Sequence, residues 1–342
     1  GTKRIEVNSA GRVMRELDRQ EGDPGLDIRL TIDADIQNFA QVRLGNESAA
    51  VVVVDVTNGD IICIASAPSF DPNLFVRGIS HTDYKALTEN DHRPLANKTV
   101  SGAYPPGSTF KVVTALAALE AGVVTPETKV SCPGYIEFGQ RRFHCWKRGG
   151  HGTVRLERSL AESCDVYYYD IAQKVGIDKI AEMGRRLGLG HKFDIPMSAV
   201  TDGIMPDKAW MLERYKQEWR IGDTINASIG QGYVLASPLQ LAVMAARVAT
   251  GRAVSPRLVK AIDGVAETVP DWPDLGINPL NLRVARGGMD AVMNGSHGTA
   301  RRARIIAPEW QMAGKTGTSQ VRNITAAERA RGVIAMSAGN HA

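Results

Sequence analysis

Residues 49–66 read AAVVVVDVTNGDIICIAS, and this stretch decides the fold class. Two runs rich in apolar and β-branched residues, Ala49–Asp55 and Ile61–Ser66, flank the turn sequence TNGD at 57–60. Asn-Gly between two such runs is the strongest short-range signal for a β-hairpin, because both residues tolerate the positive φ angles of a tight turn. We therefore predict an antiparallel hairpin at this point of the chain.

Helical patterns dominate the middle of the chain. We expect a short strand at 26–32, a helix at 33–44 capped by Asp33, and a late strand at 313–321 containing two glycines. Further helices are expected at 108–121, 157–175, 178–188, 208–217, 237–249 and 284–294. A hairpin early, helices in the middle and a strand late predict an α+β fold, an antiparallel sheet sandwiched by helices with a helical subdomain.

The composition is that of an ordinary globular protein, since 43% of the 342 residues are hydrophobic and 23% are charged. The formal net charge of +4 is mild and its basic residues are spread out, so we expect no nucleic-acid partner. No apolar run reaches the length of about 18 residues that spans a membrane. The first residues carry neither a start methionine nor a signal-peptide pattern, and we interpret them as a cut inside a longer protein.

Ser108-Thr109-Phe110-Lys111 is the first motif with catalytic chemistry. Residues three apart share a helix face, so the Ser108 hydroxyl and the Lys111 amine can meet. A serine hydroxyl needs a neighbouring base, and a lysine becomes that base when burial or a second cation lowers its pKa. Pro-Pro-Gly at 105–107 starts the helix, whose N-terminus favours negative charge on an attacking oxygen. A solvated helix start is the alternative.

Lys315-Thr316-Gly317-Thr318 is a rarer motif, expected within the strand at 313–321. Gly317 lets a substrate backbone approach closely, and Lys315 with the two threonine hydroxyls offers a cation and donors to a carboxylate. The alternative is an exposed polar edge strand.

Ser163-Cys164-Asp165 lies between these two motifs and opens a helical run. The Ser163 hydroxyl could relay protons and the Asp165 carboxylate could hold the lysines, whereas the alternative is a simple helix N-cap. A second Ser-x-Asp at 69–71 follows the hairpin and is interpreted as a turn.

Ser-x-x-Lys and Lys-Thr-Gly each occur once in the chain. With Ser-Asp-Asn between them they are the signature of penicillin-binding proteins and class A β-lactamases. Three more stretches, AYPPGSTFK at 103–111, APSFDPN at 67–73 and ASIGQG at 227–232 with PLQLA at 238–242, resemble class B penicillin-binding proteins. Within that class the chain most resembles the cell-elongation transpeptidases, from about residue 1 to residue 332.

The resemblance implies a β-lactamase/transpeptidase-like fold and a serine D,D-transpeptidase that cross-links peptidoglycan through an acyl-enzyme on Ser108, the target of β-lactams. It implies a catalytic set of Ser108, Lys111 as the base, Ser163, Asp165 and Lys315, with Thr316, Gly317 and Thr318 along the substrate. Backbone N–H groups of Ser108 and Thr318 would form the oxyanion hole. Asp165 stands where most relatives have Asn, a change that the elongation branch tolerates.

The resemblance also suggests domain boundaries. Residues 1–29 would be the end of a preceding pedestal domain and a linker, 30–332 the transpeptidase domain, and 333–342 a tail unlike the family. Only about 25 residues follow Gly317, so we expect the last strands and closing helix of the fold to be missing. The strand at 313–321 would then be an exposed sheet edge.

Three cysteines and two histidines cluster within residues 132–164. Three thiolates and one imidazole are a usual structural zinc set. We predict a zinc site at Cys132, Cys145, His151 and Cys164, with His144 as the alternate ligand, and no cofactor for catalysis. A Cys132–Cys145 disulfide is the competing interpretation, but it leaves Cys164 and His151 without a role.

Other functions share some of these motifs. A class A β-lactamase uses a Glu-x-x-x-Asn loop, and no such sequence occurs in the chain. A D,D-carboxypeptidase carries every motif and differs in using water as the acceptor. A binding-only or inactive truncated penicillin-binding protein is the alternative that is not an enzyme.

The resemblance implies partners and a location as well. The substrates would be stem peptides ending in D-Ala-D-Ala, and the ligands β-lactam antibiotics. Protein partners would be a membrane-embedded glycan polymerase and elongation scaffold proteins. The site of action would be the periplasmic face of the bacterial inner membrane, with the anchor absent from this chain.

Overall fold

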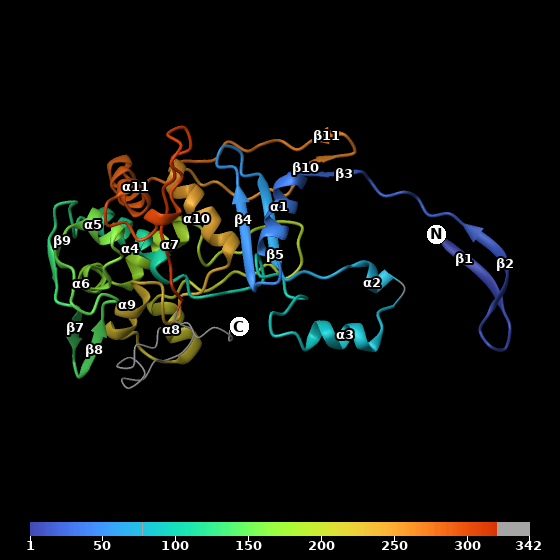
Figure 1. The fold of residues 1–342 in the computed structure, drawn as a ribbon, viewed down its shortest axis with the longest axis horizontal. Coiled ribbons are helices and arrows are strands. Elements are labelled where there is room, and N and C mark those ends of the chain that lie inside the picture. The colour runs from blue at the N-terminus through green and yellow to red at the C-terminus, as the bar shows by residue number, and fades with distance from the viewer. Residues whose placement is uncertain (77, 320–342) are drawn as a thin grey trace. The chain divides into compact units, whose positions relative to one another are not determined.

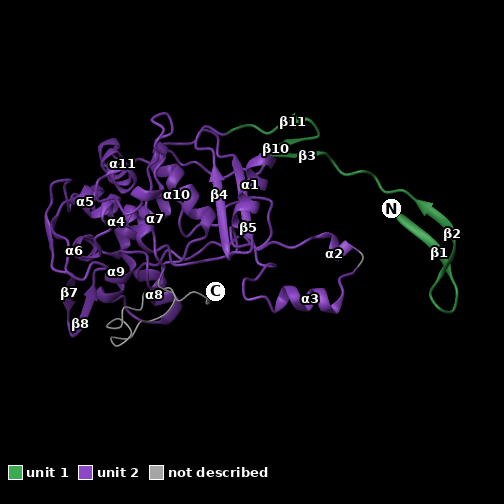
Figure 2. Cartoon of the chain, viewed as in Figure 1, with its two compact units in different colours: residues 1–31, 259–269 green, residues 32–258, 270–342 purple. Residues whose placement is uncertain are grey.

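The computed structural model describes residues 1–76 and 78–319. The chain divides into two compact units (Figure 2). Unit 1 holds residues 1–31 and 259–269, and unit 2 holds residues 32–258 and those from 270 onward. Because all three sequence motifs fall in unit 2, that unit contains the candidate site.

Unit 1 consists of short antiparallel strands. β1 (Thr2–Val7) and β2 (Val13–Gln20) form a hairpin, and β3 (Ile28–Leu30), β10 (Val259–Ile262) and β11 (Val265–Ala266) form a sheet in the order β11-β10-β3. Of these, only β3 was predicted, as part of 26–32. The first hairpin exposes every one of its residues, so it lacks the buried apolar face that identifies a strand in a sequence.

The predicted hairpin at 49–66 is present in unit 2. β4 (Ala49–Val54) pairs antiparallel with β5 (Ile61–Ala67), with Ala50 opposite Ser66 and Val52 opposite Ile64. Gly59 in the turn has a φ of +79°, a conformation that glycine adopts without strain.

Helices cover both faces of this hairpin (Figure 1). On one face, α1 (Ala34–Leu44) packs Ala40 against Cys63 and Ala65. On the other, α10 (Pro238–Thr250) packs Leu239 and Val243 into a cluster that includes Val52, Val54 and Ile64. Helices on both sides of antiparallel strands are the predicted α+β sandwich.

The largest core of unit 2 surrounds one buried helix. The 3₁₀ turn η1 (Gly107–Phe110) leads into α4 (Lys111–Glu120), along which Val113 and Leu116 are fully buried. Figure 1 shows the neighbours of α4, which are α5 (Leu156–Ala161), α6 (Asp165–Val175), α7 (Ile177–Arg186) and α11 (Pro279–Asn294). Each fully buried leucine contributes about 1.5–3 kcal/mol, so this core holds the Ser-x-x-Lys segment firmly.

The remaining elements are short. β6 (Val130–Cys132) pairs with β9 (Gly152–Val154), and β7 (Tyr135–Phe138) pairs with β8 (Arg141–His144), both antiparallel. The short helices are α2 (Asn73–Val76), α3 (His81–Thr88), α8 (Lys208–Tyr215), α9 (Ile221–Ala227) and the 3₁₀ turn η2 (Arg301–Ala303). None of the helices in the described ranges is long and apolar enough to cross a membrane.

Two sequence expectations were wrong. The helix expected at 157–175 is two helices, α5 and α6, because Ser163 has a φ of +54° and a helix cannot continue through that conformation. The strand expected at 313–321 is not one over its described part, 313–319. Its polar groups bond elsewhere: the Gly314 N–H donates to the Met289 carbonyl of α11, and the Thr318 carbonyl accepts from the Gln231 side chain.

Candidate active site

Ser108 lies in η1, one turn ahead of Lys111. The Lys111 backbone N–H donates to the Ser108 carbonyl, so the two residues are held in one continuous helical turn. The Ser108 side chain is half-buried, and its hydroxyl makes no hydrogen bond to another described residue. A hydroxyl so placed can face a substrate.

The turn before Ser108 depends on glycine. Gly107 has a φ of +57°, and its N–H donates to the Gly230 carbonyl over 2.9 Å. A Cβ on Gly107 would lie only 2.4 Å from the carbonyl oxygen of Thr318. This close approach brings the Lys-Thr-Gly segment against the Ser-x-x-Lys turn, although the two motifs are far apart in the sequence.

Lys111 is fully buried, and its Nζ contacts three oxygen atoms. Its Nζ donates to the Ser163 carbonyl over 2.9 Å, to Ser163 Oγ over 3.1 Å and to Asp165 Oδ1 over 2.6 Å. These three contacts hold the amine beside the second motif.

Asp165 is held from two sides. One carboxylate oxygen accepts from Lys111, and the other accepts the backbone N–H of Trp146 over 2.9 Å. Burial raises the pKa of Asp165, and the Lys111 charge opposes that rise. Trp146 also donates its indole N–H to the Glu162 carbonyl over 3.0 Å, which fixes the loop that carries it.

Lys315 completes the cluster from the third motif. Its Nζ donates to Ser163 Oγ over 3.0 Å and to the Thr316 carbonyl over 3.0 Å. Burial lowers the pKa of Lys315 to about 7, with the Lys111 charge lowering it further and Asp165 opposing. The Ser163 hydroxyl thus lies between two lysine amines, one of which is partly neutral near pH 7.

The three substrate-side residues lie around the same turn. A Cβ on Gly317 would meet the Pro106 carbonyl oxygen and the Thr109 side chain, each at 2.9 Å, so glycine permits the close packing here. Thr316 Oγ1 lies 2.8 Å from Thr299 Oγ1. The segments that begin at 108, 163 and 315 therefore converge.

The four predicted zinc ligands form one buried cluster. The ligand atoms of Cys132, Cys145, His151 and Cys164 lie within 4.8 Å of one another. They are the last residue of β6, the residue after β8, the residue before β9, and the N-cap of α6. His144, the alternate, is exposed on β8 and lies outside the cluster.

The distances in this cluster fit a tetrahedral ion. His151 Nδ1 lies 3.6 Å from Cys132 Sγ and 3.4 Å from Cys145 Sγ. A sulfur and a nitrogen bound to the same tetrahedral zinc lie about 3.5 Å apart. The hydrogen bond between Cys145 and Cys164 lowers the pKa of Cys145 and raises that of Cys164. All four cysteines are free thiols, contrary to the disulfide interpretation.

Sequence reasoning missed three residues of the site. Trp146 carried no signal, because its contribution to Asp165 is a backbone N–H. Gln231 was part of the quoted ASIGQG stretch, and its side chain donates to the Thr318 carbonyl over 3.2 Å. Thr299 was not considered, and only its contact with Thr316 in space reveals it.

Comparison with known proteins agrees with this geometry. Residues 49–334 match the family model described as "Penicillin binding protein transpeptidase domain". The chain belongs to this family of penicillin-binding transpeptidases.

Two relatives carry the name peptidoglycan D,D-transpeptidase MrdA. The chain is 39% identical over 336 residues to the peptidoglycan D,D-transpeptidase MrdA of Escherichia coli K12. The matched region covers 96% of this chain and 53% of that protein. The chain is 36% identical to MrdA of Acinetobacter baumannii, over 96% of this chain and 50% of that protein. The chain thus spans about half the length of the curated relatives it matches.

Solved structures of penicillin-binding protein 2 (PBP2) share the fold. Pseudomonas aeruginosa PBP2 in complex with WCK 5153 has a TM-score of 0.82 and 41% identity, over 87% of this chain and 69% of that chain. Helicobacter pylori PBP2, solved in complex with MreC, has a TM-score of 0.81 and 32% identity, over 93% of this chain and 59% of that chain. The transpeptidase fold and the family expected from the sequence are confirmed, and the similar solved structures are of PBP2.

Proposed function

We propose that this protein is a serine D,D-transpeptidase that cross-links peptidoglycan stem peptides through an acyl-enzyme on Ser108. The observation that carries the proposal is the position of the Ser163 hydroxyl, 3.1 Å from Lys111 Nζ and 3.0 Å from Lys315 Nζ. Together with the half-buried Ser108 hydroxyl one turn away, this is a nucleophile with a proton path. Membership in the transpeptidase family supports the same reaction class.

The first half-reaction begins with a proton transfer. Lys111 passes a proton through the Ser163 hydroxyl to neutral Lys315, which leaves the Lys111 amine free to act as base. Lys111 then accepts the Ser108 hydroxyl proton while Ser108 Oγ bonds to the carbonyl carbon of the penultimate D-alanine. The tetrahedral intermediate collapses, the peptide bond to the terminal D-alanine breaks, and the leaving amine takes the proton from Lys111.

The second half-reaction reverses these roles. An amine from a neighbouring stem peptide loses its proton to Lys111 and attacks the ester carbonyl. The bond to Ser108 Oγ breaks, Ser108 regains a proton, and a new amide links the two peptides. Backbone N–H groups of Ser108 and Thr318 stabilise the oxyanion in both halves, and the Thr316 and Thr318 hydroxyls hold the terminal carboxylate.

A structural zinc ion bound by Cys132, Cys145, His151 and Cys164 is part of the proposal. The fit rests on the buried donor set and on ligand separations of 3.4 Å and 3.6 Å. When bound, the ion supplies rigidity and no chemistry, because four protein ligands close its coordination shell. Our proposal includes no cofactor for catalysis.

The zinc cluster would act on the site through Asp165. Cys164 lies between Ser163 and Asp165 in the chain, and the Asp165 N–H points at Cys145 Sγ over 3.4 Å. Cys145 in turn precedes Trp146, whose N–H holds the Asp165 carboxylate. Fixing the cysteines therefore fixes the carboxylate that pairs with Lys111.

The test is covalent labelling with a fluorescent penicillin. We expect stoichiometric labelling of the protein and none of Ser108→Ala. Ser101→Ala, a change in the preceding turn, is the matched control and should label normally. Label that persists in Ser108→Ala would remove Ser108 from its role, and no label on the parent would favour the binding-only alternative.

A second assay separates transpeptidation from hydrolysis. A synthetic donor ending in D-Ala-D-Ala is incubated with and without a D-amino acid acceptor, and the products are separated by mass. We expect acceptor-dependent peptide as the main product. Hydrolysed donor alone would indicate a D,D-carboxypeptidase, and rapid turnover of nitrocefin would indicate a β-lactamase.

The whole protein would act at the periplasmic face of the bacterial inner membrane. Residues 1–29 would end a pedestal domain and 30–332 would form the transpeptidase domain, while 333–342 lie outside the described residues. The likeness to H. pylori PBP2, solved with MreC, and to a peptidoglycan synthase complex supports scaffold and glycan-polymerase partners for this chain.

A further inference from the structure

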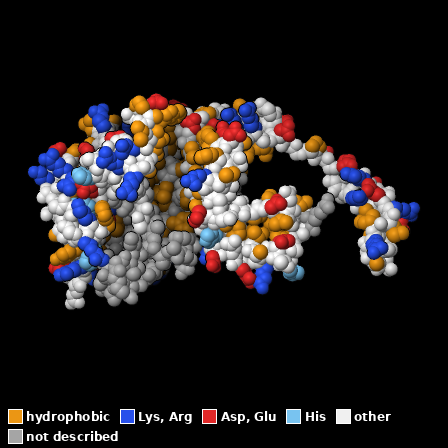
Figure 3. Space-filling model, in the orientation of Figure 1, with side chains coloured by type: hydrophobic (Ala, Val, Ile, Leu, Met, Phe, Trp, Pro, Cys, Tyr) orange, Lys and Arg blue, Asp and Glu red, His pale blue; other side chains and the backbone are white. Residues whose placement is uncertain are grey.

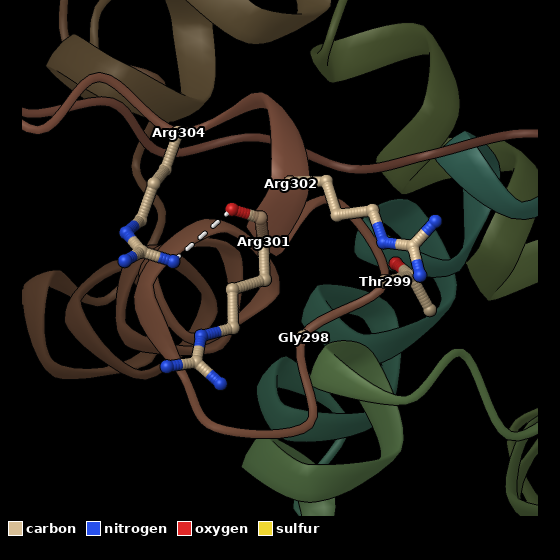
Figure 4. Close-up of a pocket in the computed structure, with 5 residues that line it drawn as sticks. All are labelled: Gly298, Thr299, Arg301, Arg302 and Arg304. Carbon is tan, nitrogen blue, oxygen red and sulfur yellow. Dashed lines mark hydrogen bonds between the residues drawn. The ribbon is translucent and has the colours of Figure 1, made fainter.

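A hollow beside the third motif is lined mainly by arginines. Gly298, Thr299, Arg301, Arg302 and Arg304 surround about 430 Å³ of space after the end of α11 (Figure 4). The three arginines are exposed and fall in and next to η2. None of the proposed steps uses them.

The charges of these arginines are not balanced. Arg301 donates to the Ser296 carbonyl over 3.4 Å, and Arg304 donates to the Arg301 carbonyl over 3.3 Å. Over the described ranges no carboxylate lies within ion-pair distance of Arg301, Arg302 or Arg304. Like charges held together repel, so a bound anion would be stabilised here, and a guanidinium matches a carboxylate with two parallel hydrogen bonds.

Basic side chains are also gathered at one end of unit 2. Figure 3 shows Lys and Arg side chains gathered over the end of unit 2 that carries α5 and α11, with few acidic ones among them. An anion approaching this end is attracted before it reaches the hollow.

A short chain of contacts joins the hollow to the catalytic cluster. Figure 4 shows the Arg302 side chain extending toward Thr299. Thr299 Oγ1 lies 2.8 Å from Thr316 Oγ1, and the Thr299 N–H donates to the Ala161 carbonyl over 3.1 Å. Ala161 precedes the Ser163 motif by two residues, so the hollow begins beside both the second and the third motif.

We propose that this arginine hollow is a substrate subsite for a carboxylate that the stem peptide carries away from its D-Ala-D-Ala end. The inference rests on the proposed function, and it adds a second anion site. Thr318 would hold the terminal carboxylate against the Gly107 turn, which leaves the arginines for another anion of the same peptide. Arg302 is the principal contact, and Arg301 and Arg304 add positive potential.

The experiment compares two synthetic donors that both end in D-Ala-D-Ala. One carries a free carboxylate upstream, and the other carries a carboxamide at the same atom. The ratio of their acylation kcat/KM values is measured on the protein, on Arg302→Gln and on Arg283→Gln. Arg283 lies on exposed α11 surface outside the hollow, so its substitution removes the same charge without touching the subsite.

The protein and Arg283→Gln should prefer the carboxylate donor by about twofold to fivefold, the range expected for an exposed ion pair. Arg302→Gln should bring the ratio close to one. A ratio of one on the parent, or an unchanged preference in Arg302→Gln, would overturn the inference. Fluorescent penicillin labelling of the parent is scored separately, because its loss would count against the proposed function and not against the subsite.

Discussion

The Ser163 hydroxyl accepts from Lys111 and Lys315 at once, over 3.1 Å and 3.0 Å. Its backbone has a φ of +54°, which is rare outside glycine and costs of order 1–3 kcal/mol. That conformation ends α5, turns the chain and lets both the carbonyl and the hydroxyl of one residue meet Lys111. We infer that the strain is retained because it builds the proton path between the two amines.

The acylation rate should therefore depend on the charge of Lys315. Burial lowers the pKa of Lys315 to about 7. Below that pH Lys315 is protonated and cannot take up a proton through Ser163, so the rate should fall about tenfold per pH unit. Above it Lys315 is neutral and the rate should level off. The measurement is the second-order rate of penicillin labelling between about pH 5 and pH 9.

Lys315→Arg tests whether Lys315 causes this rise of the labelling rate with pH. A guanidinium stays protonated throughout this range, so the variant should label slowly at every pH and lose the rise near neutrality. A pH profile in Lys315→Arg that matches the parent would show that another group titrates.

Asp165 is predicted to stabilise the fold as well as the site. Asp165→Ala would leave the Lys111 ammonium buried without its counter-charge, a change that costs about 3–5 kcal/mol in unfolding free energy. Asp165→Asn keeps an oxygen acceptor and should cost less. Urea denaturation measures both, and a loss below about 1 kcal/mol for Asp165→Ala would contradict the assigned ion pair.

At the scale of elements, α11 is held close to α5 by one glycine. A Cβ on Gly288 would lie 2.4 Å from Leu160 Cδ1 and 3.0 Å from Leu160 Cβ. Gly288→Ala should therefore force the helices apart and lower the unfolding free energy by about 1–3 kcal/mol.

Gly287 provides the matched control on the same helix. Nothing lies within 4 Å of a Cβ placed there, so Gly287→Ala should raise stability by up to about 1 kcal/mol through helix propensity alone. Thermal denaturation of both variants is the measurement. Equal effects of the two substitutions would mean that the α5–α11 contact does not depend on Gly288.

Elements with a strong local signal could be predicted from the sequence. The Asn-Gly turn between two apolar runs predicted β4 and β5, and the Asp33 cap predicted α1, where its side chain accepts from Asp35 and Ile36. The apolar pattern continues across Ser163 and favoured one helix over 157–175, although Ser163-Cys164-Asp165 was also interpreted as the start of a helical run. A strand also needs a partner, and residues 313–319 bond to α11 and Gln231 instead.

At the scale of the whole molecule, the zinc cluster should support both stability and activity. Protein purified without a His-tag should contain about one zinc per chain. Chelation should lower the melting temperature by about 5 °C or more and slow penicillin labelling, because the loop from Cys145 to Trp146 would no longer hold Asp165.

Cysteine variants test the same prediction. Cys132→Ser should lose the metal, whereas Cys63→Ala, buried in β5 away from the cluster, should retain it. Chelation that leaves both the melting temperature and the labelling rate unchanged would contradict a structural ion.

Long-range organisation was predictable only where residue types carried chemistry. Lys111, Ser163, Asp165 and Lys315 were all found from motifs, and the structure brings them together. The Cys/His set was found from composition within a short stretch. Trp146 and Thr299 could not be found, because one acts through its backbone and the other through a contact between distant segments.

In the proposed reaction, the three convergent motifs make Ser108 the nucleophile. The most direct test is to trap the acyl-enzyme with a penicillin, digest the protein and locate the adduct by tandem mass spectrometry. We predict one adduct per chain, on Ser108. An adduct on any other residue, or none under conditions in which the protein is folded, would contradict the account.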